Sequence, residues 1–555
     1  MRNRPILPRK GEVSALGTAM SGLKLATLVA RLHLDGFRVS PASYCKALWW
    51  RVAGKRLRAK ARFSPLIGRS AVAYRVWLAR RRATPAEGDA VGAPKGPSIL
   101  VIIDARDNQA EVPTTLASLA DPDRAIILDV NGSVPDSTGS LGAVARQLGR
   151  GEVWLLPLRA GDRLEPGAER HYSLAATDSD ARFIYADDDE RDARGEFTKP
   201  HFKPLWNAEL FRYHDYLSWS GIVKVDRHSL AAVDGKYDWV ERLTAQAAVS
   251  APPRHVPLVL HHRVTRPQPI PPPSLPLHRA GDLPAVSIII PTRNGTDLLR
   301  TCLEGLERTT YPALEVIIAD NDSDDATTLA LLSTLDASRH TVIRHGGPFN
   351  YSAINNAAVR HATAPFLCFL NNDIEILEPD WLSVLVTQAI REDVGAVGPM
   401  LLYPDGTVQH AGVVLGVGGG AAHAHRNIHP GEEGYFRRHT LPQFVSAVTG
   451  ACLVVARRHF DAVGGFDESN FPVAFNDVDL CLKLARIGYP AFYEPRARLV
   501  HHESKSRGND RDAAGARRLE QELRALKMLW GTDRQRDPYH HRSLSPYSEQ
   551  FVIGL

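Results

Sequence analysis

The sequence predicts two consecutive α/β units, each built on a mainly parallel β-sheet. Each unit opens with an apolar stretch that ends in polar residues, at positions 99–108 and again at 287–294. In both places a helical stretch follows, and then a second apolar stretch that ends at Leu128 and at Ala319. A strand, a helix and a second strand with short connections form a right-handed βαβ unit with parallel strands. Ligands bind beyond the carboxyl ends of such strands.

Length and composition agree with a multidomain globular protein. A chain of 555 residues is too long for one hydrophobic core, so two or three domains are expected. The hydrophobic share of 44% and the charged share of 23% are ordinary for a soluble protein. We find neither a signal peptide nor a stretch of the roughly 20 apolar residues that span a bilayer. The five cysteines are scattered without a CxxC pair, which fits a reducing, cytoplasmic location.

The first 82 residues are strongly basic, with 19 Lys and Arg against only Glu12 and Asp35. Such a block favours phosphates, either of an anionic membrane surface or of nucleic acid. Leu25 and Leu32 lie on one helical face, and tryptophans are interleaved with cations further on, as in helices that lie on a membrane. A basic, partly disordered extension is an equal alternative. Because no nucleic-acid-binding motif accompanies the charge, we expect no nucleic-acid partner.

Composition divides the chain into five segments. A stretch with six prolines between positions 267 and 276 cannot form helix or sheet, so it separates the two α/β units. A charged helical pattern at about 511–531 opens an otherwise irregular tail. The expected segments are a basic helical extension at 1–83, a first α/β unit at 98–265, a linker at 266–285, a second α/β unit at 286–508 and a helical tail at 509–555.

Two polar clusters follow the first two predicted strands of the second unit. Pro291-Thr292-Arg293-Asn294 follows the first strand, and Asp320-Asn321-Asp322-Ser323 follows the second. Together they offer acceptors for ribose hydroxyls and a base edge, and the arginine can meet a phosphate. The competing interpretation is that such residues only form turns.

A third cluster, Asn371-Asn372-Asp373, follows the apolar stretch 366–370. A carboxylate at the edge of a pocket suits a divalent cation bound to a diphosphate, because hard cations take oxygen ligands from few protein groups. The alternative is a turn that caps a helix at 378–390.

Two further patterns carry ionisable residues. In the helical stretch 475–484, Asp477 and Asp479 point in different directions, so at most one faces a ligand. The dipole of the helix also favours carboxylates in its first turn without any function. His501-His502 follows an apolar stretch, where a histidine completes a metal site or simply lies on the surface.

The order of these motifs resembles the family 2 glycosyltransferases, especially the bacterial O-antigen- and rhamnan-type group that builds the cell envelope. The matching motifs are Pro-Thr-Arg-Asn, Asp-Asn-Asp-Ser, Asn-Asn-Asp, Gly464-Gly465-Phe466-Asp467, Asn-Asp-Val-Asp-Leu from Asn476, and His-His-Glu-Ser from His501. The resemblance covers about 286–508, and Asp537-Pro538-Tyr539 also resembles the tail of that group. Through Tyr185–Asp189 and Phe202-Lys203-Pro204, the first unit resembles the extra domain of two-domain members.

The resemblance implies a GT-A fold and an inverting transfer from a nucleotide-diphosphate sugar with Mn²⁺ or Mg²⁺. Asp477 would be the general base, and Asp373 with His501 or His502 would hold the metal. The implied acceptor is a hydroxyl of a growing polysaccharide or lipid-linked glycan, and dTDP-rhamnose, UDP-sugars and GDP-sugars remain open as donors. The implied donor-binding residues are Pro291, Thr292, Arg293, Asn294, Asp320, Asp322, Asn371 and Asn372.

Two departures from the family pattern bear on these roles. The paired metal-binding acids are reduced to one carboxylate in Asn371-Asn372-Asp373, and Asn476 replaces the acid that often precedes the base. The first unit has Arg159-Ala160-Gly161-Asp162 at the metal position, and we expect no counterpart of 476–484 in it. It is therefore interpreted as a catalytically inactive copy, kept for packing or acceptor binding. A non-catalytic nucleotide-sugar or carbohydrate-binding protein is the alternative function for the whole chain.

Overall fold

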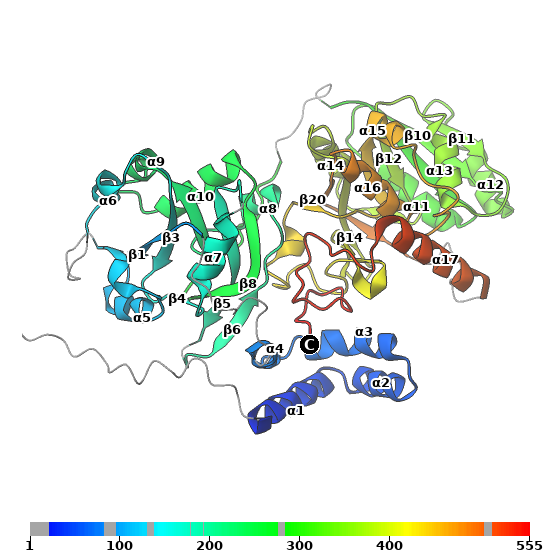
Figure 1. Cartoon of the computed structure of the whole chain (residues 1–555). Helices are drawn as coiled ribbons and strands as arrows, with labels where there is room; N and C mark the ends of the chain where they lie inside the picture. Colours follow the sequence, from blue (N-terminus) through cyan, green and yellow to red (C-terminus); the bar gives the residue numbers. More distant parts are fainter. Residues whose placement is uncertain are drawn as a thin grey trace, which may run out of the picture.

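A computed structural model describes residues 22–82, 96–129, 138–177, 179–192, 194–275, 283–503 and 513–555. Two α/β units lie side by side in it, with a group of helices from the N-terminal segment below their junction (Figure 1). Ser504, the last residue of the His-His-Glu-Ser motif, lies outside the described part of the chain, as do residues 1–21, 83–95 and 276–282. No helix in the described segments is both long and apolar enough to cross a bilayer.

The first unit is built on an eight-stranded sheet with the order β2-β1-β3-β7-β5-β8-β4, and β6 pairs with β5. Strand β1 is parallel to β2 and β3, as expected, whereas β7 runs antiparallel to both of its neighbours. The strands are β1 (Ile99–Asp104), β2 (Ile126–Leu128), β3 (Val153–Arg159), β4 (Arg163–Leu164), β5 (Phe183–Arg191), β6 (Phe197–His201), β7 (Gly221–Val225) and β8 (Arg254–Arg263).

The second unit is built on a ten-stranded sheet with the order β11-β10-β9-β12-β19-β14-β20-β13. Its first four strands in this order are parallel, and β19 is antiparallel to β12 and β14. The strands are β9 (Val286–Thr292), β10 (Leu314–Asp320), β11 (His340–Arg344), β12 (Phe366–Leu370), β13 (Ile374–Ile376), β14 (Ala396–Leu402), β15 (Val408–His410), β18 (Gln443–Val445), β19 (Cys452–Ala456) and β20 (Ala491–His501). A separate pair consists of β16 (Val413–Leu415) and β17 (Ala421–His423).

The two sheets repeat one plan. The path β2-β1-β3-β7-β5-β8-β4 corresponds strand for strand to β10-β9-β12-β19-β14-β20-β13. Each neighbouring pair also has the same relative direction in both sheets, including the parallel pairs β5–β8 and β14–β20. Two sheets that agree in order and direction along seven strands allow positions in one unit to be compared with positions in the other.

Helices cover both faces of each sheet. In the second unit, α11 and α14 pack on one face and α13, α15 and α16 on the other, because alternate side chains of β9 point to opposite faces. The helices of the units are α5 (Val112–Leu116), α6 (Leu141–Gln147), α7 (Ala168–Thr177), α8 (Ala208–Tyr213), α9 (Arg227–Ala232), α10 (Trp239–Ser250), α11 (Thr296–Glu307), α12 (Ala326–Ser333), α13 (Tyr351–Val359), α14 (Trp381–Ala389), α15 (Arg457–Ala462) and α16 (Asn476–Arg486).

Helix α10 corrects one expectation. The sequence indicated no counterpart of 476–484 in the first unit, yet α10 lies between α9 and β8 just as α16 lies between α15 and β20. The helix is present without its motif, because when the buried valines Val240 and Val478 are matched, Trp239 stands where Asp477 stands in α16. The first unit thus keeps the scaffold and lacks the carboxylate.

The basic N-terminal segment forms four helices over the described residues 22–82. Leu25, Leu28 and Val29 pack with Leu32 against Val72 and Val76, so the apolar face of the first helix is partly covered. The charged residues of the next two helices remain at the surface. The helices are α1 (Gly22–Val39), α2 (Pro41–Val52), α3 (Arg56–Ile67) and α4 (Ala73–Arg82).

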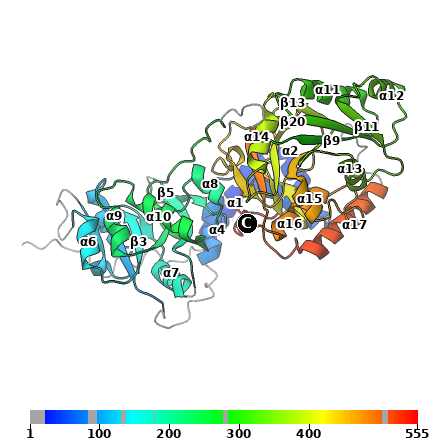
Figure 2. The same ribbon diagram turned by 90° about the horizontal axis from the view of Figure 1, so that it is seen from above.

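The C-terminal tail connects these parts. After α17 (Ala513–Trp530), which packs on the second unit, the chain returns to the junction and ends near α3 and α4 (Figures 1 and 2). Nε2 of His541 lies 3.0 Å from the carboxylate of Asp187 in the first unit, and the hydroxyls of Ser545 and Ser64 are 2.9 Å apart. The units also touch directly, since Nδ2 of Asn207 donates to the carbonyl oxygen of Phe444 (2.9 Å).

Candidate functional site

The ends of β9, β10 and β12 meet at one edge of the second sheet. Thr292 and Asp320 are register partners on neighbouring parallel strands, and both are buried. Nδ2 of Asn372, just after β12, donates to the hydroxyl of Thr292 (3.0 Å). Carboxyl ends of parallel strands lie at the same edge, so three of the polar clusters found in the sequence come together here.

In the loops after these strands, some polar side chains bond to other loop residues, whereas others are exposed to solvent. Asn294 has a φ of 55° and its side chain bonds to the amides of Asp324 and Asp325 and to the Asp324 carboxylate, so it pins one loop to the next. Arg293 is exposed, and Pro291 is buried.

Asp320 and Asp322 both face Arg344. Oδ1 of Asp320 accepts from the backbone N–H of Ser323 (3.1 Å), and Oδ2 lies 3.6 Å from Nε of Arg344. Asp322, with a φ of 54°, accepts from the N–H of Gly347 (3.1 Å). These contacts fix the orientation of both carboxylates at the end of β10.

A chain of hydrogen bonds orients His501 toward Asp373. Nε2 of Gln409 donates to Glu503 (3.2 Å), which turns the amide oxygen of Gln409 toward Nδ1 of His501 (2.7 Å). An amide oxygen only accepts, so Nδ1 carries the proton of this bond, and a lone pair on Nε2 would then face Asp373 and Nδ2 of Asn371 (3.5 Å). That Nε2 lies 3.1 Å from Oδ1 of Asp373. Two acceptors at this distance repel unless a proton or a cation lies between them.

The residues present therefore fit a divalent cation. A metal-binding histidine normally donates its other N–H to an oxygen that fixes the ring, which is the role of Gln409 here. His502 is placed differently, since its Nε2 pairs with Glu375 (2.8 Å) rather than with Asp373. The metal hypothesis thus continues with Asp373 and His501. Two protein ligands leave the remaining positions for diphosphate oxygens and water.

Asp477 lies in the first turn of α16, beside the two residues that precede β19, one of which contacts Asn371. Its Oδ2 accepts from the N–H of Gly450 (2.9 Å), and the N–H of Asn371 donates to the carbonyl of Ala451 (2.9 Å). Burial raises the pKa of Asp477 above the ordinary value of a carboxyl group. A raised pKa suits a group that accepts a proton during a reaction.

The other polar residues of this turn are engaged in packing. Oδ1 of Asp479 accepts from the indole of Trp530 on α17 (2.9 Å), and Oδ2 pairs with Lys483 (3.0 Å). Nδ2 of Asn476 donates to the carbonyl of Val473 (2.9 Å). Of the two aspartates, only Asp477 is placed toward the strand ends.

The same edge of the first unit is arranged differently. Asp162 lies between β3 and β4 as Asp373 lies between β12 and β13, and it accepts from the N–H of Val264 (2.9 Å). His262 pairs with Arg163 in register as His501 pairs with Ile374. Burial lowers the pKa of His262, but its hydrogen bonds with Asp189 and Glu165 outweigh this and raise it to about 9. A protonated imidazole offers no lone pair to a metal.

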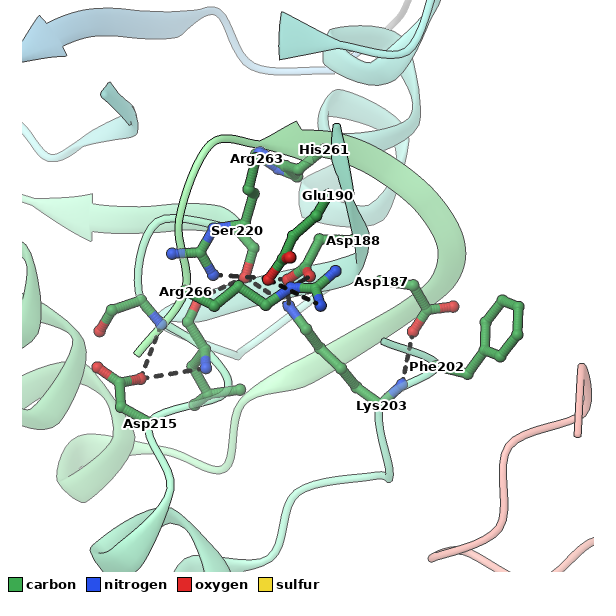
Figure 3. Close-up of polar contacts among 12 residues, drawn as sticks. Asp187, Asp188, Glu190, Phe202, Lys203, Asp215, Ser220, His261, Arg263 and Arg266 are labelled. Carbon is green, nitrogen blue, oxygen red and sulfur yellow. Dashed lines mark hydrogen bonds and ion pairs between the residues drawn. The ribbon is translucent and has the colours of Figure 1, made fainter. Parts of the chain in front are cut away.

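Charged groups buried behind this edge compensate each other. Asp188 is fully buried, 2.7 Å from Nζ of Lys203 and 2.5 Å from Nε of Arg266, with Arg263 at 3.6 Å (Figure 3). Burial opposes ionisation of Asp188, yet these cations hold its pKa well below the ordinary value. The cluster is a buried set of ion pairs centred on Asp188, and it draws Arg266 of the expected linker into the first unit.

Sequence reasoning missed Gln409 and the role of Glu503. Gln409 stands in the three-residue strand β15, and only pairing of β15 with β14 brings it to His501. Glu503 was the third residue of the His-His-Glu-Ser motif, but nothing in the sequence indicated its contact with Gln409.

Fold and site together define the class of protein: an α/β protein of the GT-A fold with a carboxylate and an imidazole paired at the carboxyl edge of its sheet. The family model described as "Glycosyl transferase family 2" matches residues 287–460, which include Asp320 and Asp373. An N-acetylglucosaminyl-diphospho-decaprenol L-rhamnosyltransferase of Mycobacterium tuberculosis is 30% identical over 233 residues, 38% of this chain and 74% of the relative. The chain belongs to glycosyl transferase family 2.

Two longer relatives extend the similarity. The uncharacterized protein y4gI of Sinorhizobium fredii is 36% identical over 517 residues, or 82% of this chain. The O-antigen biosynthesis protein RfbC of Myxococcus xanthus is 36% identical over 402 residues, or 64% of this chain. The chain spans 55% of the length of the first and 31% of the second.

Proposed function

We propose that the second unit transfers a sugar from a nucleotide-diphosphate sugar to an acceptor hydroxyl, with inversion at the anomeric carbon. The observation that carries the proposal is the pairing of Asp373 with an oriented His501 at the strand edge, next to the partly exposed Asp477. Asp320, Asp322, Thr292 and Arg293 border the same edge and are the proposed donor contacts, together with Asn371 and Asn372.

Asp373 and His501 would hold a Mn²⁺ or Mg²⁺ ion through Oδ1 and Nε2. The bound cation would supply positive charge to the departing diphosphate. The chain supplies the rest: Asp320 and Asp322 orient the nucleoside, and Arg293 meets a phosphate oxygen. His502 and Pro291 are not needed as direct ligands in this arrangement.

Asp477 acts as the general base. The acceptor hydroxyl oxygen attacks the anomeric carbon while the bond from that carbon to the diphosphate oxygen breaks. The hydroxyl proton passes to a carboxylate oxygen of Asp477, and the nucleoside diphosphate leaves with the bonding electrons. The hydrogen bond from Gly450 holds the carboxylate in position before the transfer.

The proposed donor is dTDP-rhamnose, with UDP- and GDP-sugars as the other candidates, and the proposed acceptor is a lipid-linked or growing cell-surface glycan. This choice follows the names of the rhamnosyltransferase and O-antigen biosynthesis relatives.

The test is nucleotide release by the purified protein from a panel of dTDP-, UDP- and GDP-sugars, with Mn²⁺, Mg²⁺ or EDTA. Release from one donor that is lost with EDTA and in Asp373→Ala supports the proposal, with Asp162→Ala as a matched control in the first unit. Absence of both release and calorimetric donor binding refutes it. Donor binding without release, even when glycan acceptors are added, supports the alternative of a non-catalytic binding protein.

We further propose that helices α1 to α3 attach the protein to an anionic membrane surface. Trp49, Val52 and Leu57 are exposed, at 58%, 82% and 68%, and Nζ of Lys55 lies 5.7 Å from the ring of Trp49. Exposed apolar side chains among cations are typical of interfacial helices. Sedimentation with phosphatidylglycerol vesicles should be reduced in Trp49→Ala and unchanged in Val249→Ala, an exposed valine on α10. Binding to DNA but not to vesicles would refute this.

A further inference from the structure

The first unit has a cavity at the edge that corresponds to the proposed donor site of the second. The cavity has a volume of about 230 Å³ and lies at the ends of β1, β3 and β8. Its walls include Asp104, Arg106, Asp107, Arg159, Trp219 and Tyr237. We infer that this cavity binds a neutral sugar residue of a glycan, and so makes the catalytically inactive unit a saccharide-binding module.

The cations of the cavity are already paired. Arg106 binds Asp104 through two hydrogen bonds of 2.9 and 2.6 Å and also donates to the carbonyls of Lys236 and Tyr237. Arg159 lies 3.5 Å from Glu241 and donates to Thr265 (3.2 Å). Two arginines against Asp104, Asp107 and Glu241 leave no net positive charge for a diphosphate.

The imidazole at the metal position of this unit is engaged on both nitrogens. Asp162 accepts a backbone N–H, and the imidazole at the position of His501 is His262, held between two carboxylates. A nucleotide diphosphate bound without a metal needs unpaired cations. The edge that fits a charged donor in the second unit therefore has, among the described residues, no unpaired positive charge for one in the first.

The exposed ring of Tyr237 and the polar groups around the cavity suit a sugar. Tyr237 is 66% exposed, and its hydroxyl donates to Oδ2 of Asp107 (2.5 Å), which is itself exposed beside Asn108. A sugar ring offers C–H faces to aromatic rings and hydroxyls to carboxylates, amides and guanidinium groups. The volume is below the about 300–1,000 Å³ of drug-sized ligand sites, as expected for one monosaccharide unit.

The backbone at the cavity wall is held in a costly conformation. Trp219 has a φ of 66°, which a bulky residue seldom adopts, and its indole donates to Glu241 (2.8 Å) while Arg159 lies 4.5 Å over its ring. Such strain persists where the surrounding structure fixes it and concentrates at ligand sites. Here it places Trp219, just before β7, at the wall of the cavity.

Saturation-transfer NMR of the full chain with methyl glycosides of L-rhamnose, D-mannose and D-glucose tests the inference without needing turnover. We expect transfer to at least one glycoside, and a loss of affinity of at least about fivefold in Tyr237→Ala and Asp107→Ala. Asp121→Ala, at the opposite end of the sheet, should be unchanged. Inorganic pyrophosphate should not compete.

Three results would overturn the inference. The first is no transfer to any of the glycosides at millimolar concentration, and the second is transfer that both cavity variants leave unchanged. The third is competition by pyrophosphate, which would identify an anion site. Because the catalytic residues are intact in these variants, donor hydrolysis should remain at the wild-type rate, so failure here is distinguishable from failure of the proposed function.

Discussion

Replacing Gln409 by leucine tests whether the orientation of His501 serves a metal. Gln409 is 2% exposed, and its amide connects Glu503 to the Nδ1–H of His501. Leucine has a similar size but no acceptor, so the ring is free to turn and Nε2 is no longer held toward Asp373. Loss of such a supporting group weakens metal binding by about 10- to 100-fold, which corresponds to about 1.4–2.8 kcal/mol.

The assay is titration of the purified protein with Mn²⁺, followed by electron paramagnetic resonance of the free ion, without donor. Gln388→Leu provides a matched control, since Gln388 is also buried but lies on α14. Thermal melting should show both variants folded. If Gln409→Leu bound Mn²⁺ within twofold of the wild type while Asp373→Ala did not bind it, the argument from the imidazole lone pair would be refuted.

Further predictions concern the base, the metal count and the buried charges. Asp477→Asn should lower kcat by at least about 100-fold with unchanged donor affinity; normal turnover would exclude Asp477 as the base. Burial raises the pKa of Asp477, and only the ionised carboxylate accepts a proton. As the pH is lowered, kcat should therefore fall with an apparent pKa above that of an ordinary carboxyl group; an apparent pKa at the ordinary value would contradict this. Titration of Asp162→Ala with Mn²⁺ should still show one binding site. Loss of that site would instead assign Mn²⁺ binding to the first unit. Lys203→Met should lower the free energy of unfolding by about 3–5 kcal/mol in urea, because it removes a partner of the buried Asp188; a change below about 1 kcal/mol would show that Arg266 compensates alone.

Local sequence patterns predicted the strands and helices that carry the proposed site residues. The apolar stretch before Asp320 and that before Asp373 are strands β10 and β12, and the first turn of α16 holds Asp477, as the spacing of apolar residues indicated. The mainly parallel sheet was predicted from the βαβ units. The antiparallel strands β7 and β19 were not predicted, because each pairs with strands that are distant in the chain rather than with a hairpin partner.

Features that depend on distant pairing were not predicted. Nothing near Gln409 marks it as a partner of His501, since the two meet only through the register of β14 with β15 and β20. The motif search also missed α10, because a helix that has lost its functional residues keeps only its apolar face. Residues 187–189 were noticed as a family feature, but their compensation by Lys203 and Arg266 required the folded structure.

The contact between Asp187 and His541 has a consequence for synthesis of the protein. Asp187 is buried in β5, and its partner is added roughly 350 residues later, after about 20–70 s at the usual rate of translation. During that time the surface of β5 and β8 that the tail covers in the complete protein is still uncovered. We therefore expect chaperones to bind this uncovered surface during synthesis. We also expect the second unit to fold before the tail completes the first.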